Sequence, residues 1–315
     1  MAASIRERST IVLGTRGSKL AMQQSEWVQA RLREYAPDVS VTLRRFQTSG
    51  DKILDVPLAN IGGKGLFVKE IEEALLAGEI DLAVHSMKDV PTQLPQGLAI
   101  LCVPQREDPR DALISRTGCI FKDLPRGAKI GTSSLRRQAQ FLHARPDLKI
   151  EVLRGNLDTR LRKLREGQYD AIVLAVAGLQ RLGWAHEITE YLDPGISLPA
   201  IGQGALGIEG RQDDVFICSL LGRLDHVSSR VAVLAERALL DRLEGGCQVP
   251  IAAYATISGT NLRLEGLVAS VDGKELIRDV VEGTTECASE VGRRLGERLL
   301  ACGGDKILKA IYGTA

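Results

Sequence analysis

The sequence predicts an α/β fold of two similar lobes with a central cleft, followed by a smaller C-terminal α+β domain with a three-stranded antiparallel sheet. A strand, a Gly-Thr turn and the start of a helix occur at residues 11–18 and again at 129–134. A helix ending at glycine, then an Asp and a nearly continuous apolar strand, occur at 78–84 and again at 167–176. Such apolar runs are typical of strands in parallel sheets. Two α/β lobes form a cleft where ligands commonly bind.

Length and composition indicate a globular protein. The chain has 315 residues, of which 44% are hydrophobic and 26% charged, enough for two or three domains. With a net charge of only +1, the total charge does not indicate a general role in binding polyanions. The six cysteines form no C-x-x-C pair, so neither a zinc site nor a disulfide framework is predicted. Without an apolar run for a signal peptide or a membrane span, we expect a cytoplasmic protein.

The chain is expected to return to its first lobe near residue 200. We predict domain 1 at residues 1–104 and 200–222, domain 2 at 105–199 and domain 3 at 223–315. The segment Gly202-Gln203-Gly204-Ala205-Leu206-Gly207 is a formal G-x-G-x-x-G pattern. A dinucleotide site is a weak interpretation, because the residues after it alternate like a strand instead of opening a helix.

The first lobe begins with a strand at 11–13, which we expect to end at Gly14. Ser18 is a plausible N-cap of the helix that follows, and unpaired helix N–H groups would then point above the sheet, beside Arg16. The later elements are a strand at 39–46, a polar turn at 48–51, a glycine-rich loop at 62–65 and a helix at 66–77. The loop is not a P-loop, because Lys64 is followed by Gly.

The stretch from Glu79 to Pro91 is the strongest candidate for a reacting site. An apolar strand turns abruptly polar at its carboxyl end, where ligands bind in open α/β sheets. The polar residues there are His85, Ser86, Lys88 and Asp89. Pro91 then ends the strand, because it has no N–H to donate. Asp89 is our candidate catalytic group; the alternative is a turn aspartate that caps its own backbone.

Positive charge is concentrated in the second lobe. Residues 126–181 contain twelve Lys or Arg against five Asp or Glu. Arginine pairs with carboxylate or phosphate oxygens two at a time, so several arginines near strand ends indicate an anionic ligand. The arginines placed there are Arg136, Arg137, Arg154, Arg160 and Arg181, the last after a strand ending at 176–178. Surface ion pairs are the alternative interpretation.

The C-terminal domain is expected to contain hairpins and one exposed cysteine. We predict a helix at 231–243 capped by Ser228 or Ser229, strands at 251–257, 262–271 and 275–281, and a final helix at about 285–301. Cys247 follows Gly245-Gly246, which would leave its thiol accessible. It is a candidate for covalent attachment of a group, although most single cysteines are small buried hydrophobic residues.

Several sequence blocks, in order and over nearly the whole chain, resemble the hydroxymethylbilane synthase (porphobilinogen deaminase) family. The blocks are residues 14–16, 62–70, 84–91, 106–112, 131–137, 153–156 and 243–250. The resemblance implies an enzyme that links four porphobilinogen units head to tail, releases four ammonias and yields hydroxymethylbilane. It also implies three domains, the first two similar to the lobes of periplasmic binding proteins. From the sequence itself we expect a monomer that binds neither nucleic acid nor membrane.

The resemblance also assigns roles to residues. Cys247 would hold a dipyrromethane cofactor through a thioether, and Asp89 would assist the loss of ammonia and the proton transfers. The cofactor or substrate carboxylates would contact Arg16, Ser18, Lys64, Phe67, Lys88, Thr132, Ser133, Ser134, Arg136, Arg137, Arg154, Gly155, Asn156, Arg160, Arg181 and Gln203. Gly17 and Asn60 depart from the family pattern, which has a longer polar residue and a basic residue at these positions.

Two other functions are compatible with parts of the sequence. A solute-binding protein would share the two lobes and the arginines, but it would require export and would leave Cys247 unexplained. A nucleic-acid binder could use the basic stretch at 126–181, but aromatic residues make up only 4% of the chain, so stacking platforms are missing.

Overall fold

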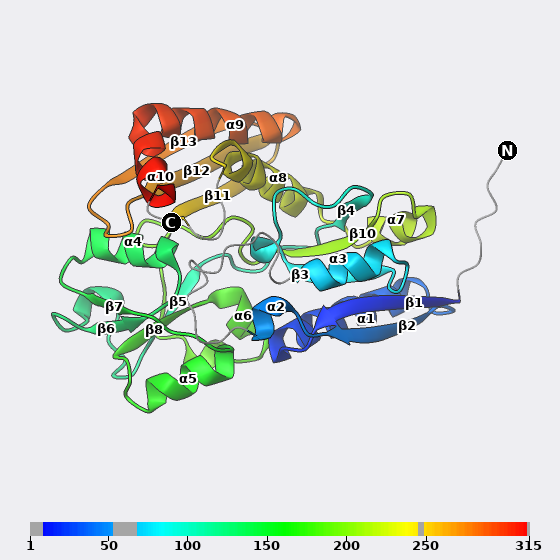
Figure 1. The fold of residues 1–315 in the computed structure, drawn as a ribbon, viewed down its shortest axis with the longest axis horizontal. Helices are drawn as coiled ribbons and strands as arrows, with labels where there is room; N and C mark the ends of the chain where they lie inside the picture. The colour runs from blue at the N-terminus through cyan, green and yellow to red at the C-terminus, as the bar shows by residue number, and fades with distance from the viewer. Residues whose placement is uncertain (1–8, 53–67, 245–248, 314–315) are drawn as a thin grey trace. The chain divides into compact units, whose positions relative to one another are not determined.

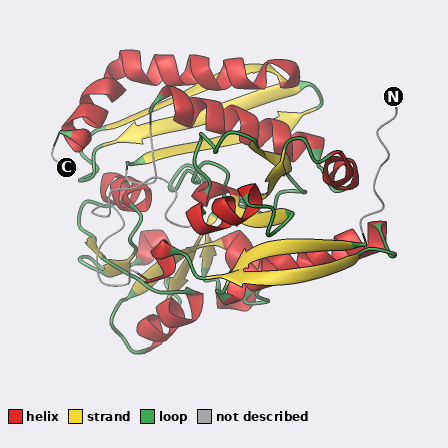
Figure 2. Ribbon diagram, turned by 45° about the vertical axis from the view of Figure 1, so that its right-hand side comes forward, coloured by secondary structure: helices red, strands yellow, loops and turns green. Residues whose placement is uncertain are grey.

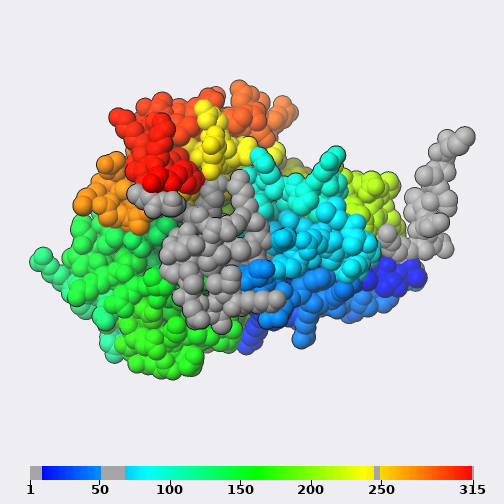
Figure 3. Space-filling view, viewed as in Figure 1, coloured from blue at the N-terminus to red at the C-terminus, as the bar shows by residue number. Residues whose placement is uncertain are grey.

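The computed structural model describes residues 9–52, 68–244 and 249–313, which divide into two compact units. The described residues up to 106 form the first unit together with residues 205–230, and residues 107–204 form the second unit together with the C-terminal part. Figure 3 shows the yellow-green segment packed beside the cyan segment of the first unit, although they are far apart in sequence. No helix in the described ranges is long and apolar enough to cross a membrane.

Lobe 1, in the first unit, is built on a five-stranded sheet with the strand order β2-β1-β3-β10-β4 (Figure 1). Strands β1, β2 and β3 are parallel, whereas β10 runs antiparallel to both β3 and β4. The strands are β1 (Thr10–Arg16), β2 (Ser40–Phe46), β3 (Leu82–Ser86), β4 (Leu98–Cys102) and β10 (Leu206–Arg211). The predicted return of the chain to a strand after Gly204 is therefore found in β10.

Helices cover both faces of this sheet. The apolar residues of α1 and α7 pack on one face and those of α3 on the other. The helices are α1 (Lys19–Tyr35), α2 (Ser49–Lys52), α3 (Lys69–Leu76) and α7 (Val215–Gly222). The prediction that the first strand ends at Gly14 is wrong: β1 continues to Arg16. A Cβ at Gly14, inside β1, would overlap Ile80 Cδ1, so a larger residue here would force that side chain to shift.

Lobe 2, in the second unit, repeats the arrangement of lobe 1. Its strand order is β7-β6-β8-β5-β9, in which β6 is parallel to β7 and β8, and β5 is antiparallel to β8 and β9. The strands are β5 (Asp111–Ser115), β6 (Lys129–Gly131), β7 (Lys149–Glu151), β8 (Ala171–Ala175) and β9 (Glu190–Tyr191). Position by position the strand directions match those of lobe 1, which confirms the predicted pair of similar lobes.

The helices of lobe 2 also lie on both faces of the sheet. Apolar residues of α5 and α6 pack on one face, and Phe141 of α4 packs on the other. The helices are α4 (Leu135–Ala144), α5 (Leu157–Arg165) and α6 (Val176–Arg181). Residues 176–178, predicted as the end of a strand, instead begin α6, so Arg181 ends a helix. Short 3₁₀ turns occur at Phe121–Asp123 and Ala185–Glu187.

The C-terminal domain contains the predicted three-stranded antiparallel sheet, with the order β11-β12-β13 (Figure 2). Gly259 and Gly273 have φ values of 60° and 72° in the two hairpin turns. The elements are α8 (Val227–Arg242), β11 (Ile251–Ser258), β12 (Asn261–Ala269), β13 (Leu276–Thr284), α9 (Ala288–Leu299) and α10 (Asp305–Tyr312). Helices α8, α9 and α10 share the core on one face, whereas Ala139 of α4 packs on the other.

Two predictions for this domain are corrected. Helix α8 begins at Val227, so Ser228 and Ser229 lie in its first turn instead of before it. The helix predicted at about 285–301 is α9, but it is not the final one: α10 follows it after a turn at Leu300–Gly304, in which Gly303 has φ 106°.

Candidate functional site

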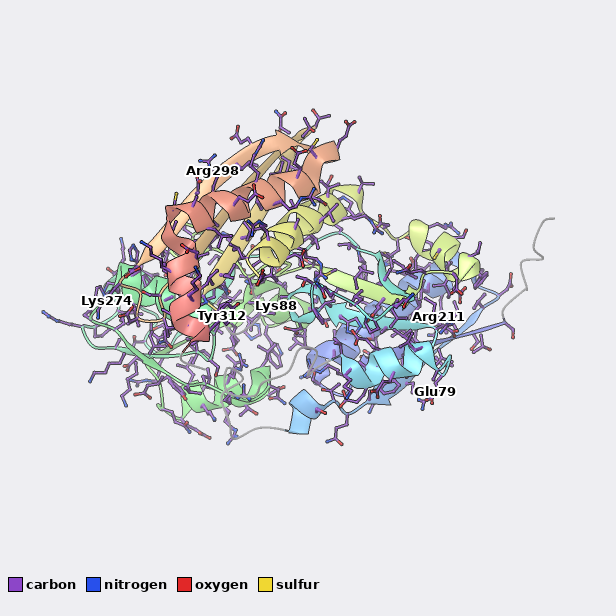
Figure 4. All side chains as sticks on the ribbon, turned by 45° about the horizontal axis from the view of Figure 1, so that its top comes forward. Glu79, Lys88, Arg211, Lys274, Arg298 and Tyr312 are labelled. Carbon is purple, nitrogen blue, oxygen red and sulfur yellow. The ribbon has the colours of Figure 1, made fainter. Side chains whose placement is uncertain are left out.

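The carboxyl ends of β1 and β3 carry the polar residues predicted for lobe 1. These two strands are parallel neighbours, so the residues that follow them lie at the same edge of the sheet. Ser18 caps α1, since its Oγ accepts a hydrogen bond from Ala21 N at 3.3 Å. We call the residues after these strands, Arg16, Ser18, Lys88 and Asp89, the lobe 1 edge (Lys88 is labelled in Figure 4).

The turn that carries Asp89 is held on several sides. It is the 3₁₀ turn Met87–Asp89, in which Met87 is 2% exposed. Met87 N donates to Ala205 O at 3.0 Å, and before the turn Gln24 Nε2 of α1 donates to Ser86 Oγ at 3.1 Å. Val90 N closes the turn by donating to Met87 O, so the backbone carbonyl and not the Asp89 carboxylate caps it. Asp89 itself is partly buried.

The carboxyl ends of β6, β7 and β8 form a corresponding edge in lobe 2. Thr132, Ser133 and Ser134 follow β6, Arg154, Gly155 and Asn156 follow β7, and α6 follows β8. We call these residues, together with Arg160 and Arg181, the lobe 2 edge. Arg154, Arg160 and Arg181 are all partly buried.

The hydroxyl and amide side chains of the lobe 2 edge shape its turns. Ser134 Oγ accepts from Arg137 N and caps α4, and Asn156 Oδ1 accepts from Thr159 N and caps α5. Thr132 Oγ1 accepts from Ser134 N at 3.1 Å, and Ser133 Oγ donates to Leu153 O at 2.7 Å. These contacts fix the start of two helices whose N–H groups face the edge.

Gly155 and the two neighbouring arginines also make defined contacts. Gly155 has φ 110°, and a Cβ there would lie 2.7 Å from Thr159 Cγ2, so the turn requires glycine. Arg160 Nε donates to Gly155 O at 2.8 Å. Arg181 Nη2 donates to Gly204 O at 2.7 Å. Burial lowers the pKa of Arg181, against an opposing effect of Glu107, and a guanidinium stays charged in proteins.

Arg136 and Arg137 are buried and bound to a carboxylate that the sequence analysis did not identify. Asp111, at the start of β5, is 0% exposed. Its Oδ2 lies 2.9 Å from Arg136 Nη2, and its Oδ1 lies 2.7 Å from Arg137 Nη2. Ser197 Oγ donates to Oδ2 at 2.7 Å, and Gln203 Nε2 donates to Oδ1 at 2.8 Å. We call these five residues the Asp111 network.

Other N–H groups of the two guanidiniums in the Asp111 network donate hydrogen bonds to backbone carbonyls. Arg136 Nη1 donates to Leu198 O, and Arg137 Nη1 donates to Val173 O at 2.7 Å. Burial alone would raise the pKa of Asp111, but the charges of both guanidiniums and the hydrogen bonds from Arg137 and Ser197 hold it well below its usual range. The carboxylate is therefore ionised, and it fixes both arginines.

One atom of this network is not satisfied by the protein. Arg137 Nε is buried and has no hydrogen-bond acceptor among the described residues. A buried guanidinium N–H without an acceptor is unfavourable, so a ligand oxygen at this position would be stabilising. Together with the partly buried Arg154, Arg160 and Arg181, it makes the lobe 2 edge suited to a ligand with several carboxylates or phosphates.

Three predicted site residues lie outside the described residues: Lys64, Phe67 and Cys247. Asp111 was missed although it belongs to a quoted sequence block at 106–112. The sequence did contain a signal for it. Asp111 begins an apolar strand, and the chain has two adjacent arginines, Arg136 and Arg137, that could pair with it.

Comparisons with known proteins identify relatives over most of the chain. Residues 11–219 match the family model "Porphobilinogen deaminase, dipyromethane cofactor binding domain", and residues 231–301 match "Porphobilinogen deaminase, C-terminal domain". The porphobilinogen deaminase of Pelobacter propionicus is 56% identical over 300 residues, covering 95% of this chain and 96% of the relative. That of Syntrophotalea carbinolica is 58% identical over 303 residues, covering 96% of each chain.

Solved structures give weaker similarities. The Bordetella pertussis BvgS VFT2 domain aligns with a TM-score of 0.42 at 14% identity, covering 69% of this chain and 86% of that domain. The periplasmic aliphatic sulphonate binding protein SsuA of Escherichia coli aligns with a TM-score of 0.40 at 14% identity, covering 75% of this chain and 71% of that protein. Neither similarity is close enough to bear on function.

Proposed function

Because this chain belongs to the porphobilinogen deaminase family, we infer that it joins four porphobilinogen molecules head to tail with release of ammonia. It is a transferase of tetrapyrrole biosynthesis, and hydrolysis of the completed chain releases hydroxymethylbilane. The observation that carries this function is the match of both family models, over residues 11–219 and 231–301. The match includes the C-terminal domain, which a solute-binding protein would leave unexplained.

The donors of the lobe 2 edge fit the dipyrromethane cofactor of the family. Dipyrromethane carries acidic side chains, and when bound it supplies the pyrrole to which the first substrate is joined. The unsatisfied Arg137 Nε and the partly buried Arg154, Arg160 and Arg181 are suited to bind carboxylates. The Asp111 network would orient Arg136 and Arg137 before the cofactor arrives. We propose Cys247 as its attachment point.

Asp89 is proposed as the catalytic residue. Loss of ammonia from porphobilinogen leaves positive charge on the substrate, and a carboxylate beside it lowers the energy of the transition state. The same carboxylate can accept a hydrogen bond from a pyrrole N–H and take part in proton transfer. The anchored turn Met87–Asp89 supports this role, because a catalytic group works best when its position is fixed before the reaction.

Arg16, Ser18 and Lys88 are proposed to bind substrate carboxylates at the lobe 1 edge. The support is their position after β1 and β3, at the same edge of the sheet as Asp89. We make the corresponding proposal for Thr132, Ser133, Ser134, Gly155 and Asn156 at the lobe 2 edge, where helix N-termini provide N–H groups. We propose that Gln203 contributes indirectly, because its side chain donates a hydrogen bond to Asp111.

The experiment that tests the function combines a substrate assay with the intact mass of the purified protein. We expect porphobilinogen to be consumed, ammonia and a linear tetrapyrrole to appear, and the protein mass to exceed the sequence mass by a dipyrrole. Cys247→Ala should lose both the added mass and the activity. Cys302→Ala, which alters an exposed cysteine, is the matched control and should retain both. An active protein with an unmodified mass would contradict the attachment.

We further propose that the enzyme acts in the cytoplasm as a monomer. The five described cysteines are free, as expected in a reducing compartment. Light scattering on the eluting protein should give the mass of one chain, and a stable mass of two chains would contradict this proposal.

A further inference from the structure

Three ionisable side chains are buried together in lobe 1, beneath the strand that leads to Asp89. His85 lies on β3, Glu209 on β10 and Glu72 on α3, and they are 4%, 0% and 8% exposed. In the antiparallel pairing His85 is opposite Gly207 and Glu209 is opposite Ala83. His85, Glu209 and Ala83 therefore point to the same face of the sheet, the face on which α3 packs. We call His85, Glu209 and Glu72 the buried acid cluster.

The buried acid cluster has more acceptors than donors. His85 Nε2 lies 2.9 Å from Glu209 Oε2, a contact without the alignment of a hydrogen bond. Neither oxygen of Glu209, nor Glu72 Oε1, accepts a hydrogen bond from any described residue. Two ionised carboxylates facing a single imidazole would leave net negative charge in the interior, which is strongly unfavourable. A proton on one carboxyl removes that charge and supplies an O–H donor.

Among the described residues, the elements packed here supply no further positive charge to the cluster. The ionisable residues of α3, β3, β10 and β4 are Lys69, Glu70, Glu72, Glu73, His85, Cys102, Glu209 and Arg211. Arg211 donates to the carbonyls of Leu75 and Ile80, and Cys102 belongs to the core on the opposite face. Lys69 is paired with Glu73 in an exposed contact.

The proton is best placed on Glu72. Burial, followed by the charge of Glu209, raises the pKa of Glu72 to about 7, with a smaller opposing effect of His85 and a small raising effect of Glu73. Glu72 is therefore half protonated near neutral pH. Below that pH Glu72 is mainly a carboxylic acid, which removes its negative charge from the cluster and supplies an O–H donor.

The structure assigns the buried acid cluster as a positioning device for the Asp89 turn, in which Glu72 acts as a carboxylic acid that completes the His85–Glu209 pair. His85 is the second-last residue of β3, directly before the segment that carries Ser86 and the turn Met87–Asp89. On the other face of the sheet, Gln24 holds Ser86. The end of β3 is thus held from both faces of the sheet. On the α3 face, the interaction depends on the proton carried by Glu72. This inference rests on the proposed role of Asp89.

Glu72→Gln tests the inference, because it keeps the shape and a hydrogen-bond donor but cannot lose a proton. We expect kcat of the unmutated enzyme to fall as the pH rises above about 7, with KM nearly unchanged. In Glu72→Gln that fall should move up by at least one pH unit. Glu209→Gln, which removes the partner of His85, should lower kcat about tenfold at all pH values while the dipyrrole mass is retained. Glu73→Gln, on the exposed side of α3, is the matched control and should behave like the unmutated enzyme.

The outcomes separate this inference from the proposed function. An unmutated enzyme that does not consume porphobilinogen would overturn the proposed function itself. If that enzyme is active and Glu72→Gln has the same pH profile as Glu73→Gln, the positioning role is overturned. A second measurement tests the inference without the variant, in case the variant folds poorly. In the unmutated protein, the infrared absorption of a buried protonated carboxyl should disappear as the pH rises through about 7. A carboxyl signal that is absent at pH 6 would also overturn the inference.

Discussion

The two lobes have the same strand order and directions, yet they treat buried charge in opposite ways. In lobe 2 the carboxylate of Asp111 is bound by two guanidiniums, a hydroxyl and an amide. In lobe 1 Glu209 contacts the imidazole of His85, Glu72 interacts electrostatically with both, and three oxygens of the two carboxylates accept no hydrogen bond from a described residue. The lobe 2 arrangement stabilises the permanent charge of Asp111, whereas the lobe 1 arrangement requires a proton on one of its carboxyls.

The register of the sheets shows why the two arrangements serve different purposes. Asp111 pairs with Ala175, the last residue of β8, and therefore lies at the carboxyl edge of lobe 2. The equivalent residue in lobe 1 is Leu206, which pairs with Ser86 at the end of β3. Glu209 lies three residues deeper. Lobe 2 thus fixes cations at its edge, whereas lobe 1 has its buried charge below the edge and presents Asp89 above it.

The largest effect is expected from Asp89→Asn. The substitution preserves shape and removes charge, so kcat should fall by about a thousandfold while folding is retained. A steady-state assay of porphobilinogen consumption gives kcat, and the melting temperature monitors folding. Near-normal turnover would place the reacting carboxylate elsewhere and would remove the functional contrast between the edges.

Asp111→Asn should have the largest effect on stability. It leaves two buried guanidiniums without their carboxylate, which typically costs about 3–5 kcal/mol of unfolding free energy. Urea unfolding measures this loss. The same change in lobe 1, Glu209→Gln, should cost much less at pH 8, because it removes negative charge from a cluster with too few donors. Equal losses in the two variants would show that the lobes do not differ in this way.

The pH dependence of stability should come partly from Glu72. Its folded pKa of about 7 lies above its ordinary value of 4.5, so the folded protein binds this proton more tightly than the unfolded chain. The contribution is complete below about pH 4.5 and is lost as the pH rises through 7, up to about 3 kcal/mol in all. Glu72→Gln should remove that part of the slope. Parallel slopes for the variant and the unmutated protein, measured by urea unfolding between pH 5 and 8, would contradict it.

The smallest effects are expected where the lobes agree. Ser18 and Ser134 cap the first helix of each lobe in the same way. Replacing either one by Ala should lower the unfolding free energy by about 1 kcal/mol. Unequal losses of unfolding free energy, measured by urea unfolding under identical conditions, would indicate that one serine makes a stabilising contact besides its helix cap.

Local features of the fold were predictable from the sequence because they depend on neighbouring residues. The Ser18 cap, the helix ends near Gly78 and Gly167 and the hairpin turns at Gly259 and Gly273 follow from short patterns. The repeat of the lobes followed from two such patterns that each occur twice. The polar end of β3 also followed, because an apolar run turns polar there.

The features that were missed depend on residues far apart in the chain. Asp111 meets Arg136 across 25 residues and Gln203 across 92. The sequence pattern of two arginines could indicate an ion pair or a ligand site, but it could not identify the internal partner. Residues 176–178 are as apolar as the strand before them, so the start of α6 was hidden. The buried acid cluster joins three elements, and only the sheet register brings His85 and Glu209 to one face.

We propose that the lobe 1 edge performs the chemistry and that the lobe 2 edge holds the bound group. The direct measurement is intact mass and turnover on the same preparations of Asp89→Asn and Arg154→Met. We predict that Asp89→Asn retains the full dipyrrole mass with kcat lowered about a thousandfold, whereas Arg154→Met has a reduced share of molecules with that mass. Asp89→Asn protein that lacks the added mass, or that turns over at the unmutated rate, would contradict the account.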